Sequence, residues 1–199
     1  MRIVTLIGLI GSGKSSFRSF MQEKAHPCLD LDSACMDLYA LDPVKEALCE
    51  HFGVGIYKDL AAGIINKEAV AQRIFVSKQD LCALEEILYP RLESVLYSWL
   101  ADQKANKNAL CLIECSVYKG SKTAFKVPDE WLVAVSTLPH IRTERLLRRG
   151  LGYKDIEARM RNQLTDAELE ALAHQVIDNN GTYEDLRCHF DAWYEQHCP

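Results

Sequence analysis

The chain has little of what marks membrane, secreted or nucleic-acid-binding proteins. None of its apolar runs approaches the length that spans a bilayer, and no secretory leader pattern opens it. Its 28 acidic side chains outnumber its 23 basic ones, for a formal net charge of −5, which argues against a general binder of nucleic acid. We therefore expect a soluble cytoplasmic protein with neither a membrane nor a nucleic-acid partner.

Metal-binding and guanine-binding motifs are also missing. The eight cysteines include no C-x-x-C pair and no spacing typical of a zinc site. Cys188-His189 and His197-Cys198 invite a metal interpretation, but scattered buried thiols in a reducing compartment explain them better. The run from Asn106 to Ala109 reads Asn-Lys-Asn-Ala and lacks the aspartate that reads guanine. A GTPase is therefore not expected.

What the chain does contain is a phosphate-binding loop motif. Residues 8–15 read Gly-Leu-Ile-Gly-Ser-Gly-Lys-Ser and fit G-x-x-x-x-G-K-[ST]. The glycines let backbone N–H groups converge on one phosphate, Lys14 can reach the outer phosphates, and Ser15 offers a hydroxyl to Mg²⁺. A chance Gly/Ser loop is the alternative. The apolar run 2–7 before the motif and the helix-like residues 16–24 after it provide the strand, loop and helix that a real nucleotide site needs.

Apolar runs and helical spacing predict one α/β domain over residues 1–199, with a parallel sheet covered by helices on both faces. The expected strands are residues 2–7, 26–30, 109–114, 131–136 and 174–178. The expected helices include 33–39, 141–149, 154–164, 166–173 and 183–195. Between the second and third strands, residues 42–105 form a largely helical insertion that we interpret as an acceptor-binding lobe. Its leucine stripe (Leu81, Leu84, Leu88, Leu92 and Leu96) indicates core, and Pro90 predicts a break or kink.

A basic cluster stands out on this acidic chain. Residues 142–161 hold seven Arg or Lys side chains and three acidic ones. Arg142, Arg145 and Arg149 share one face of a helix by their spacing, and the following Gly-Leu-Gly is a credible hinge. Arg159 and Gln163 lie four residues apart on the next predicted helix. We interpret residues 149–165 as an arginine-bearing lid that closes over a nucleotide; a solvated pair of basic helices is the alternative.

Two aspartates follow the second predicted strand. Asp30 and Asp32 stand at the sheet edge where ligands bind in such folds, and alternation sends both side chains to one side if the strand persists that far. A carboxylate there could accept a proton from an attacking hydroxyl or hold Mg²⁺ through water. Helix capping by Asp32 or Ser33 is the other interpretation. We favour Asp32 as the base.

The ordered set of motifs resembles the dephospho-coenzyme A kinase family along nearly the whole chain. The phosphate loop alone would not single out this family, but the order of the set is specific. The matching runs are Ile10 to Ser15, Leu29-Asp30-Leu31-Asp32, Arg73-Ile74-Phe75, Glu144-Arg145-Leu146 with Arg149, Arg159 with Gln163, and Val176 to Gly181.

This resemblance implies transfer of the γ-phosphate of ATP, with Mg²⁺, to the ribose 3′-hydroxyl of dephospho-coenzyme A. By position it makes Asp32, Lys14 and Arg145 catalytic, and places Asn179 and Asn180 near the adenine. The implied ATP-binding residues are Gly11, Ser12, Gly13, Lys14, Ser15, Ser16, Arg145, Arg149, Asn179 and Asn180. The implied acceptor residues are Asp32, Arg73 and Tyr89, and the implied Mg²⁺ ligand is Ser15, with Asp32 acting through water.

The acceptor side departs from the family pattern. Tyr89-Pro90 stands where the family has His-Pro, and the run from Ile113 to Tyr118 replaces Pro-Leu-Leu-Phe-Glu. Two alternatives therefore stay open. One is a kinase of the same fold that acts on another hydroxyl or on a nucleoside monophosphate. The other is an ATP-binding homologue without catalytic activity.

Overall fold

The computed structural model describes residues 1–74, 76–116, 118, 125–161 and 163–198. The chain divides into two compact units. The first holds residues 1–30, 101–123 and 127–199, and the second holds residues 31–100 and 124–126. Phe75 of the family-like run and Val117 after the third predicted strand lie outside the described residues.

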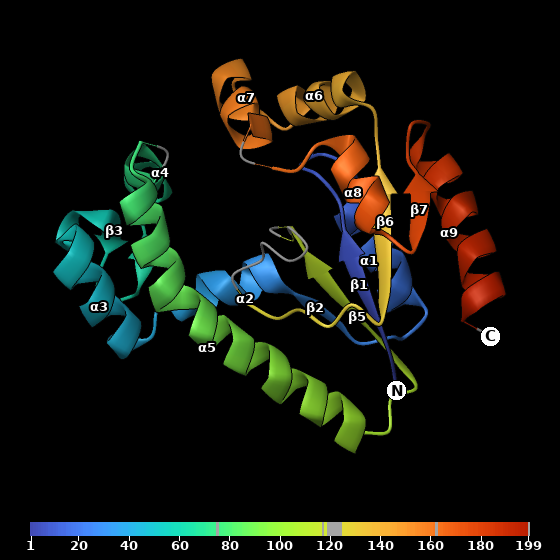
Figure 1. Cartoon of the computed structure of the whole chain (residues 1–199), viewed down its shortest axis with the longest axis horizontal. Coiled ribbons are helices and arrows are strands. Elements are labelled where there is room, and N and C mark those ends of the chain that lie inside the picture. Colours follow the sequence, from blue (N-terminus) through green and yellow to red (C-terminus); the bar gives the residue numbers. More distant parts are fainter. Residues whose placement is uncertain (75, 117, 119–124, 162, 199) are drawn as a thin grey trace. The chain divides into compact units, whose positions relative to one another are not determined.

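A five-stranded parallel sheet forms the centre of the first unit (Figure 1). Its order is β2-β5-β1-β6-β7, so that β1 lies between β5 and β6. The parallel sheet predicted from the apolar runs is confirmed, and each strand begins and ends within two residues of its expected bounds. The strands are β1 (Arg2–Ile7), β2 (Cys28–Asp30), β5 (Leu110–Cys115), β6 (Trp131–Ser136) and β7 (Gln175–Asp178).

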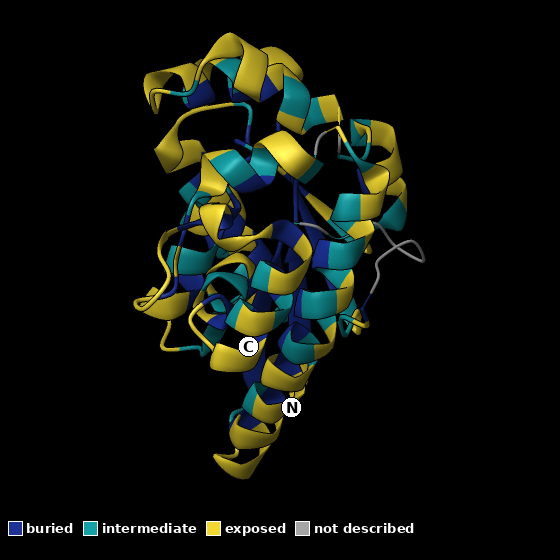
Figure 2. Cartoon of the chain, turned by 90° about the vertical axis from the view of Figure 1, so that its left-hand side faces the viewer, coloured by how far each residue is buried: buried dark blue, intermediate teal, exposed yellow. Residues whose placement is uncertain are grey.

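Helices cover both faces of this sheet, also as predicted. On one face, α1 (Lys14–Glu23) and α9 (Tyr183–His197) pack with Val4 and Leu6 of β1 in one hydrophobic cluster. The rings of Phe17 and Phe190 meet edge to face at 5.0 Å within it. On the other face, Leu169 of α8 (Asp166–Leu172) packs with Ile7, Leu132 and Ala134. The alternation of side chains along β1 thus supplies both cores, and Figure 2 shows burial concentrated on the strands.

Two helices lie between β6 and α8. They are α6 (Pro139–Arg148) and α7 (Tyr153–Arg161). The prediction that Arg159 and Gln163 lie on one helix is wrong, because α7 ends at Arg161. The physical reason is the start of α8: its N-cap Thr165 is extended, with φ −72° and ψ 160°, so the chain must leave helical geometry before it.

The second unit is mainly helical, with a small hairpin that the sequence did not predict. Strands β3 and β4 pair antiparallel there. Leu84, Leu88, Leu92 and Leu96 of the predicted stripe are buried, whereas Leu81 is half-buried. The elements are α2 (Leu31–Leu38), α3 (Asp42–Phe52), the 3₁₀ turn η1 (Val54–Ile56), β3 (Tyr57–Asp59), β4 (Ile64–Ile65), α4 (Lys67–Ile74) and α5 (Lys78–Ala105).

The long helix α5 runs through Pro90, so a break at this proline is not observed. A proline inside a helix leaves a carbonyl of the preceding turn without its usual N–H partner. For Pro90 that carbonyl belongs to Glu86; on the next residue, the guanidinium of Arg91 donates to the carbonyl of Ile87 at 2.7 Å. Among the described residues, none of the helices combines the length and apolarity needed to cross a membrane.

Candidate nucleotide-binding site

The phosphate loop, residues 8–13, joins β1 to α1 and needs glycine at two positions. Gly11 and Gly13 have φ of +79° and +101°, in the left-handed region. A Cβ on Gly13 would stand 2.1 Å from Nδ2 of Asn179, and one on Gly11 would stand 3.1 Å from the carbonyl oxygen of Arg142. Both glycines therefore allow a backbone conformation and a close contact that other residues would disrupt.

The start of α1 brings the predicted phosphate and Mg²⁺ groups to the loop. Lys14 is buried, and its Nζ donates to the carbonyl of Gly8 at 2.8 Å. The Ser15 hydroxyl lies 3.4 Å from Oε1 of Glu114, and the backbone N–H of Ser16 donates to the Gly13 carbonyl at 3.0 Å. The positive end of the α1 dipole adds to the attraction for an anion here.

Glu114 is a candidate functional residue that sequence reasoning missed. It sits near the carboxyl end of β5, is 5% exposed, and lies beside the loop strand β1. Its Oε2 is 2.8 Å from Nε of Arg18, whose Nη2 is 3.1 Å from Asp30. An acidic residue closing an apolar strand was the available signal. This carboxylate, next to the Ser15 hydroxyl, supplies an oxygen of the kind that Mg²⁺ prefers.

The strand does not persist far enough to send the side chains of Asp30 and Asp32 to one side. Strand β2 ends at Asp30 and α2 begins at Leu31, so strand alternation does not extend to Asp32. The carboxylate of Asp30 instead pairs with Arg18 in the first unit. Asp32 lies in the first turn of α2, inside the helix rather than at its N-cap. Its negative charge adds to the effect of burial, which raises the pKa of Cys35 to about 11.

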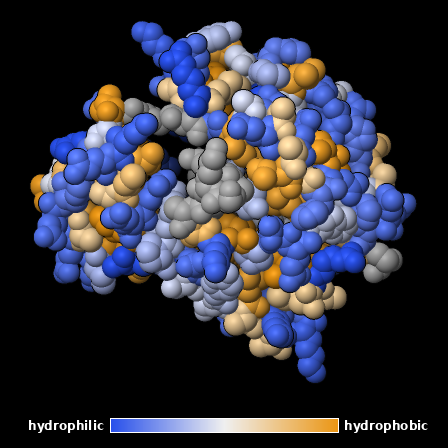
Figure 3. All heavy atoms as spheres, viewed as in Figure 1, coloured by the Kyte–Doolittle hydropathy of each residue, from blue (hydrophilic) through white to orange (hydrophobic). Residues whose placement is uncertain are grey.

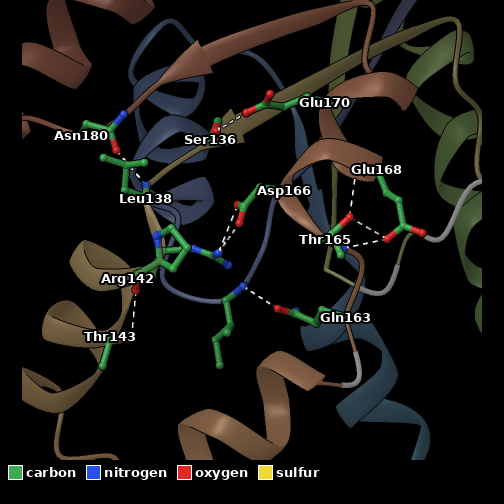
Figure 4. A network of polar contacts seen from close by, with 12 residues as sticks. Ser136, Leu138, Arg142, Thr143, Gln163, Thr165, Asp166, Glu168, Glu170 and Asn180 are labelled. Carbon is green, nitrogen blue, oxygen red and sulfur yellow. Dashed lines mark hydrogen bonds and ion pairs between the residues drawn. The ribbon is translucent and has the colours of Figure 1, made fainter.

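Behind the loop, buried polar groups from the ends of β6 and β7 hold its backbone. Asn179 is 4% exposed and donates from Nδ2 to the Ser12 carbonyl at 2.6 Å. Nη2 of Arg145 donates to the carbonyls of Asn179 and Gly181 at 3.0 and 3.1 Å. Desolvation, and next the charge of Arg149, lower the pKa of Arg145. The neighbouring Asn180 accepts the N–H of Leu138 at 2.8 Å through Oδ1 (Figure 4).

Two further contacts lie near the loop (Figure 4): one joins Gln163, which precedes α8, to the loop, and the other joins α6 to the first residue of α8. Oε1 of Gln163 accepts the N–H of Ile10 at 2.9 Å. Nη2 of Arg142 reaches both carboxylate oxygens of Asp166, at 3.0 and 2.8 Å, and desolvation lowers the pKa of this buried arginine. Gln163 and Asp166, which both follow α7 in the sequence, are thus held by the loop and by α6.

The cations around α7 differ from those of α6. Arg149, Lys154 and Arg159 are exposed, and no ion pair joins them to any residue the structure describes. Strongly hydrophilic side chains project from α7 at the top of Figure 3. Of the three arginines expected on one helix face, Arg142 and Arg145 lie on α6 and Arg149 is its C-cap residue.

The predicted acceptor residues all belong to the second unit. Asp32 is on α2, Arg73 is exposed at the end of α4, and Tyr89 is on α5. The Tyr89 hydroxyl donates to Oε1 of Glu85 at 3.1 Å, and its ring lies 4.9 Å from that of Phe125. Of the predicted ATP residues outside the motif, the structure brings Asn179 against Ser12 and Gly13, and Arg145 against Asn179, in the first unit.

The donor set fits a magnesium–nucleotide rather than a metal held by protein alone. Within the described part of the chain, no group of three His, Cys, Asp or Glu side chains could hold a metal ion. Ser15 and Glu114 offer oxygen ligands, and Mg²⁺ commonly completes its coordination with substrate phosphates and water. A nucleotide at the loop would supply those phosphates.

A parallel sheet with β1 central and a glycine loop leading from it into α1 defines an α/β protein of the P-loop kinase type. A sequence model of the dephospho-CoA kinase family matches residues 2–185. The chain belongs to the dephospho-CoA kinase family, as its motif order indicated.

Individual relatives agree with this assignment. The dephospho-CoA kinase of Chlorobium chlorochromatii is 30% identical over 198 residues, covering 98% of this chain and 92% of that protein. A crystal structure from Thermus thermophilus superposes with a TM-score of 0.76 at 25% identity, covering 100% of this chain and 98% of the other. Dephospho-CoA kinase from Campylobacter jejuni shares the fold, with a TM-score of 0.70 at 16% identity over 98% of this chain and 97% of that one.

Proposed function

We propose that this protein transfers the γ-phosphate of ATP to the ribose 3′-hydroxyl of dephospho-CoA, the last step of coenzyme A synthesis. The observation that carries the proposal is the family match over residues 2–185, which includes the phosphate loop and the groups around it. Sequence similarity at about 30% to a dephospho-CoA kinase across nearly the whole chain supports the same reaction.

Each group at the loop has a role in this reaction. Phosphoryl transfer needs phosphates that are held in place and charge that is neutralised, more than it needs covalent chemistry. The loop N–H groups from Gly11 to Ser16 bind the phosphates, and Lys14 exchanges its contact with the Gly8 carbonyl for the outer phosphates. Ser15 and Glu114 hold Mg²⁺, which supplies neutralisation of the phosphate oxygens.

The arginines complete the phosphate site. Arg145, beside Asn179, contributes positive charge at the rim of the loop, Asn180 lies near the nucleotide base, and Asn179 supports the loop from behind. Arg149 and Arg159 belong to a lid formed by residues 149–165. Arginine suits this role because its planar guanidinium binds phosphate oxygens in pairs.

The second unit carries the acceptor in this proposal. Residues 42–105 form the acceptor-binding insertion, with Arg73 and Tyr89 as binding groups. Asp32 accepts the proton of the ribose hydroxyl as that oxygen attacks the γ-phosphorus. Tyr89 already presents a hydroxyl held by Glu85, so it can offer a polar contact where the family has histidine.

Product analysis tests the proposal. The protein is incubated with Mg·ATP and dephospho-CoA. The expected product is coenzyme A, which is dephospho-CoA phosphorylated at the ribose 3′-hydroxyl, with ADP in equal amount. A parallel panel replaces the acceptor with AMP, other nucleoside monophosphates or shikimate. A faster reaction with one of those acceptors would assign a different kinase activity. ATP binding without transfer to any acceptor would indicate a homologue without catalytic activity.

The proposed base has its own test within this assay. Asp32→Asn keeps the size of the side chain but cannot accept the proton, so kcat is expected to fall by about 10²–10⁴ while ATP affinity is retained. A loss of ATP affinity with kcat preserved would make Asp32 a structural or magnesium-binding group instead.

A further inference from the structure

Thr137 is a buried residue at the back of the loop that the proposed mechanism has not used. It follows β6 directly and is 1% exposed. Its hydroxyl oxygen lies 2.9 Å from the carbonyl of Ser12 and 3.2 Å from the carbonyl of Asn179. A threonine hydroxyl has one hydrogen to donate, so it serves one of these carbonyls at a time.

Distance assigns that hydrogen to Ser12, because the Ser12 carbonyl is the nearer of the two acceptors. Nδ2 of Asn179 donates to the same Ser12 carbonyl at 2.6 Å. The carbonyl of Ser12, inside the phosphate loop, thus receives two buried donors and uses both of its lone pairs.

These two donors fix the orientation of one peptide plane. In a planar trans peptide, the C=O of Ser12 and the N–H of Gly13 point in opposite directions. Donors that hold the Ser12 oxygen against the ends of β6 and β7 therefore turn the Gly13 N–H away from them, toward the phosphate side of the loop. Gly13, with φ of +101°, has no side chain to restrict this plane, so the hold must come from outside the loop.

We infer that Thr137 is a positioning residue for the ATP phosphates, which acts with Asn179 by locking the Ser12–Gly13 peptide so that its N–H faces the anion. The inference rests on the proposed nucleotide site and not on which acceptor is phosphorylated. The effective dielectric constant inside the site is lower than in water, so an N–H that points at the phosphate interacts with it more strongly. Alignment before ATP arrives avoids the cost of ordering the loop on binding.

Thr137→Val tests the inference, because valine has nearly the same shape but no hydroxyl. Binding of Mg·ATP is measured by calorimetry without acceptor, together with kcat and KM. We expect Kd for ATP to rise about tenfold, the size of one buried hydrogen bond lost. Inorganic triphosphate, which lacks the nucleoside, should compete more weakly by a similar factor. Thr137→Ser restores the hydroxyl and should return Kd to within about threefold of the parent protein.

Thr143→Val is the matched control. The hydroxyl of Thr143 donates to the carbonyl of Pro139 within α6, at 2.9 Å, so its removal should leave ATP affinity unchanged. A Thr137→Val protein that is folded and binds ATP and triphosphate as tightly as the parent would overturn the inference. So would weakened ATP binding that Thr137→Ser does not restore, because that would indicate a packing role only.

Two further arms keep the result decisive. If Thr137→Val does not fold, Thr137→Cys keeps the volume with a weak donor, and normal ATP affinity in that variant overturns the inference. If the parent protein binds ATP but does not phosphorylate dephospho-CoA, the proposed reaction fails while the calorimetric comparison still decides the role of Thr137.

Discussion

The phosphate loop and α7 are both proposed to bind the phosphates of ATP, yet the protein builds them in opposite ways. The loop is enclosed: Ser12 and Lys14 are buried, and groups from β6, β7 and α6 hold its backbone. In α7 one residue, Ile156, is buried, and its cations extend into solvent.

This difference indicates two tasks: the loop positions the phosphates, and the cations of α7 attract them. The loop must present N–H groups at fixed angles, which demands buried and satisfied hydrogen bonds. The α7 cations need only approach an anion, and side chains in water can do this without a fixed scaffold. Changes in the loop should therefore affect both binding and chemistry, whereas changes in α7 should reduce activity without affecting stability.

The largest effect is expected from the loop lysine. Lys14→Ala removes the one cationic side chain of the loop, and kcat/KM for ATP should fall by about 10²–10³, the range seen when a preorganised charge contact is lost. Steady-state kinetics at saturating acceptor measures the loss. Lys14→Met, which keeps the stem, controls for packing and should lose nearly as much. Activity within about tenfold of the parent protein would contradict the assignment of the loop.

The fold around this loop was predictable because its signals are local. The continuous apolar runs at 2–7 and 131–136 gave strands with the observed bounds, since strands buried on both faces need no alternation. The hairpin of Tyr57–Asp59 with Ile64–Ile65 was missed because runs of three and two residues carry no period. The end of β2 at Asp30, which keeps strand alternation from reaching Asp32, is equally invisible in one sequence.

The next largest effect concerns the ion pair that joins α6 to α8. Arg142→Met keeps the apolar stem but removes the guanidinium that pairs with Asp166. The Asp166 side chain is 38% exposed and can be hydrated, so the cost should be about 2 kcal/mol of unfolding free energy, below that of a fully buried pair. Urea denaturation measures it.

A double-mutant cycle sharpens this result. If the ion pair is the cause, Asp166→Asn should add little further loss in the Arg142→Met background, because the interaction is already gone. Fully additive losses from the two substitutions would show that the pair contributes nothing, and that the loss comes from other contacts of the Arg142 guanidinium.

A smaller effect is expected in α7. Arg159→Gln should lower kcat/KM for ATP about tenfold, with the loss shrinking at high salt because exposed charges are screened. Unfolding free energy should stay within about 0.5 kcal/mol of the parent value. Arg161→Gln is the matched control, since Arg161 pairs with Glu157 at 3.1 Å on the same helix. Equal losses from both variants would indicate general charge attraction instead of a lid contact.

The polar network of the site could not be predicted in this detail. The motif predicts Lys14 and Ser15, and the family resemblance Arg145, but the partners that hold Ser12 come from residues 125 and 167 positions away. Such pairs depend on how strands are ordered in the sheet, and one sequence does not record the register. Glu114 could have been found, because an acidic residue near the carboxyl end of an apolar strand stands at the edge of a parallel sheet where ligands bind.

The smallest effect tests whether the return from α7 matters to the loop. Thr165 caps α8 in a reciprocal arrangement with Glu168 (Figure 4), and Thr182 caps α9 in the same way with Asp185. Replacing either threonine with alanine should cost about 1 kcal/mol of unfolding free energy.

Thr165 stands two residues after Gln163, whose side chain accepts the N–H of Ile10, so loosening this cap also loosens a contact with the loop. Thr165→Ala should therefore reduce kcat/KM for ATP about twofold, and Thr182→Ala should not, although both lower stability alike. Equal kinetics in the two variants would show that α8 supports the fold without influencing the loop.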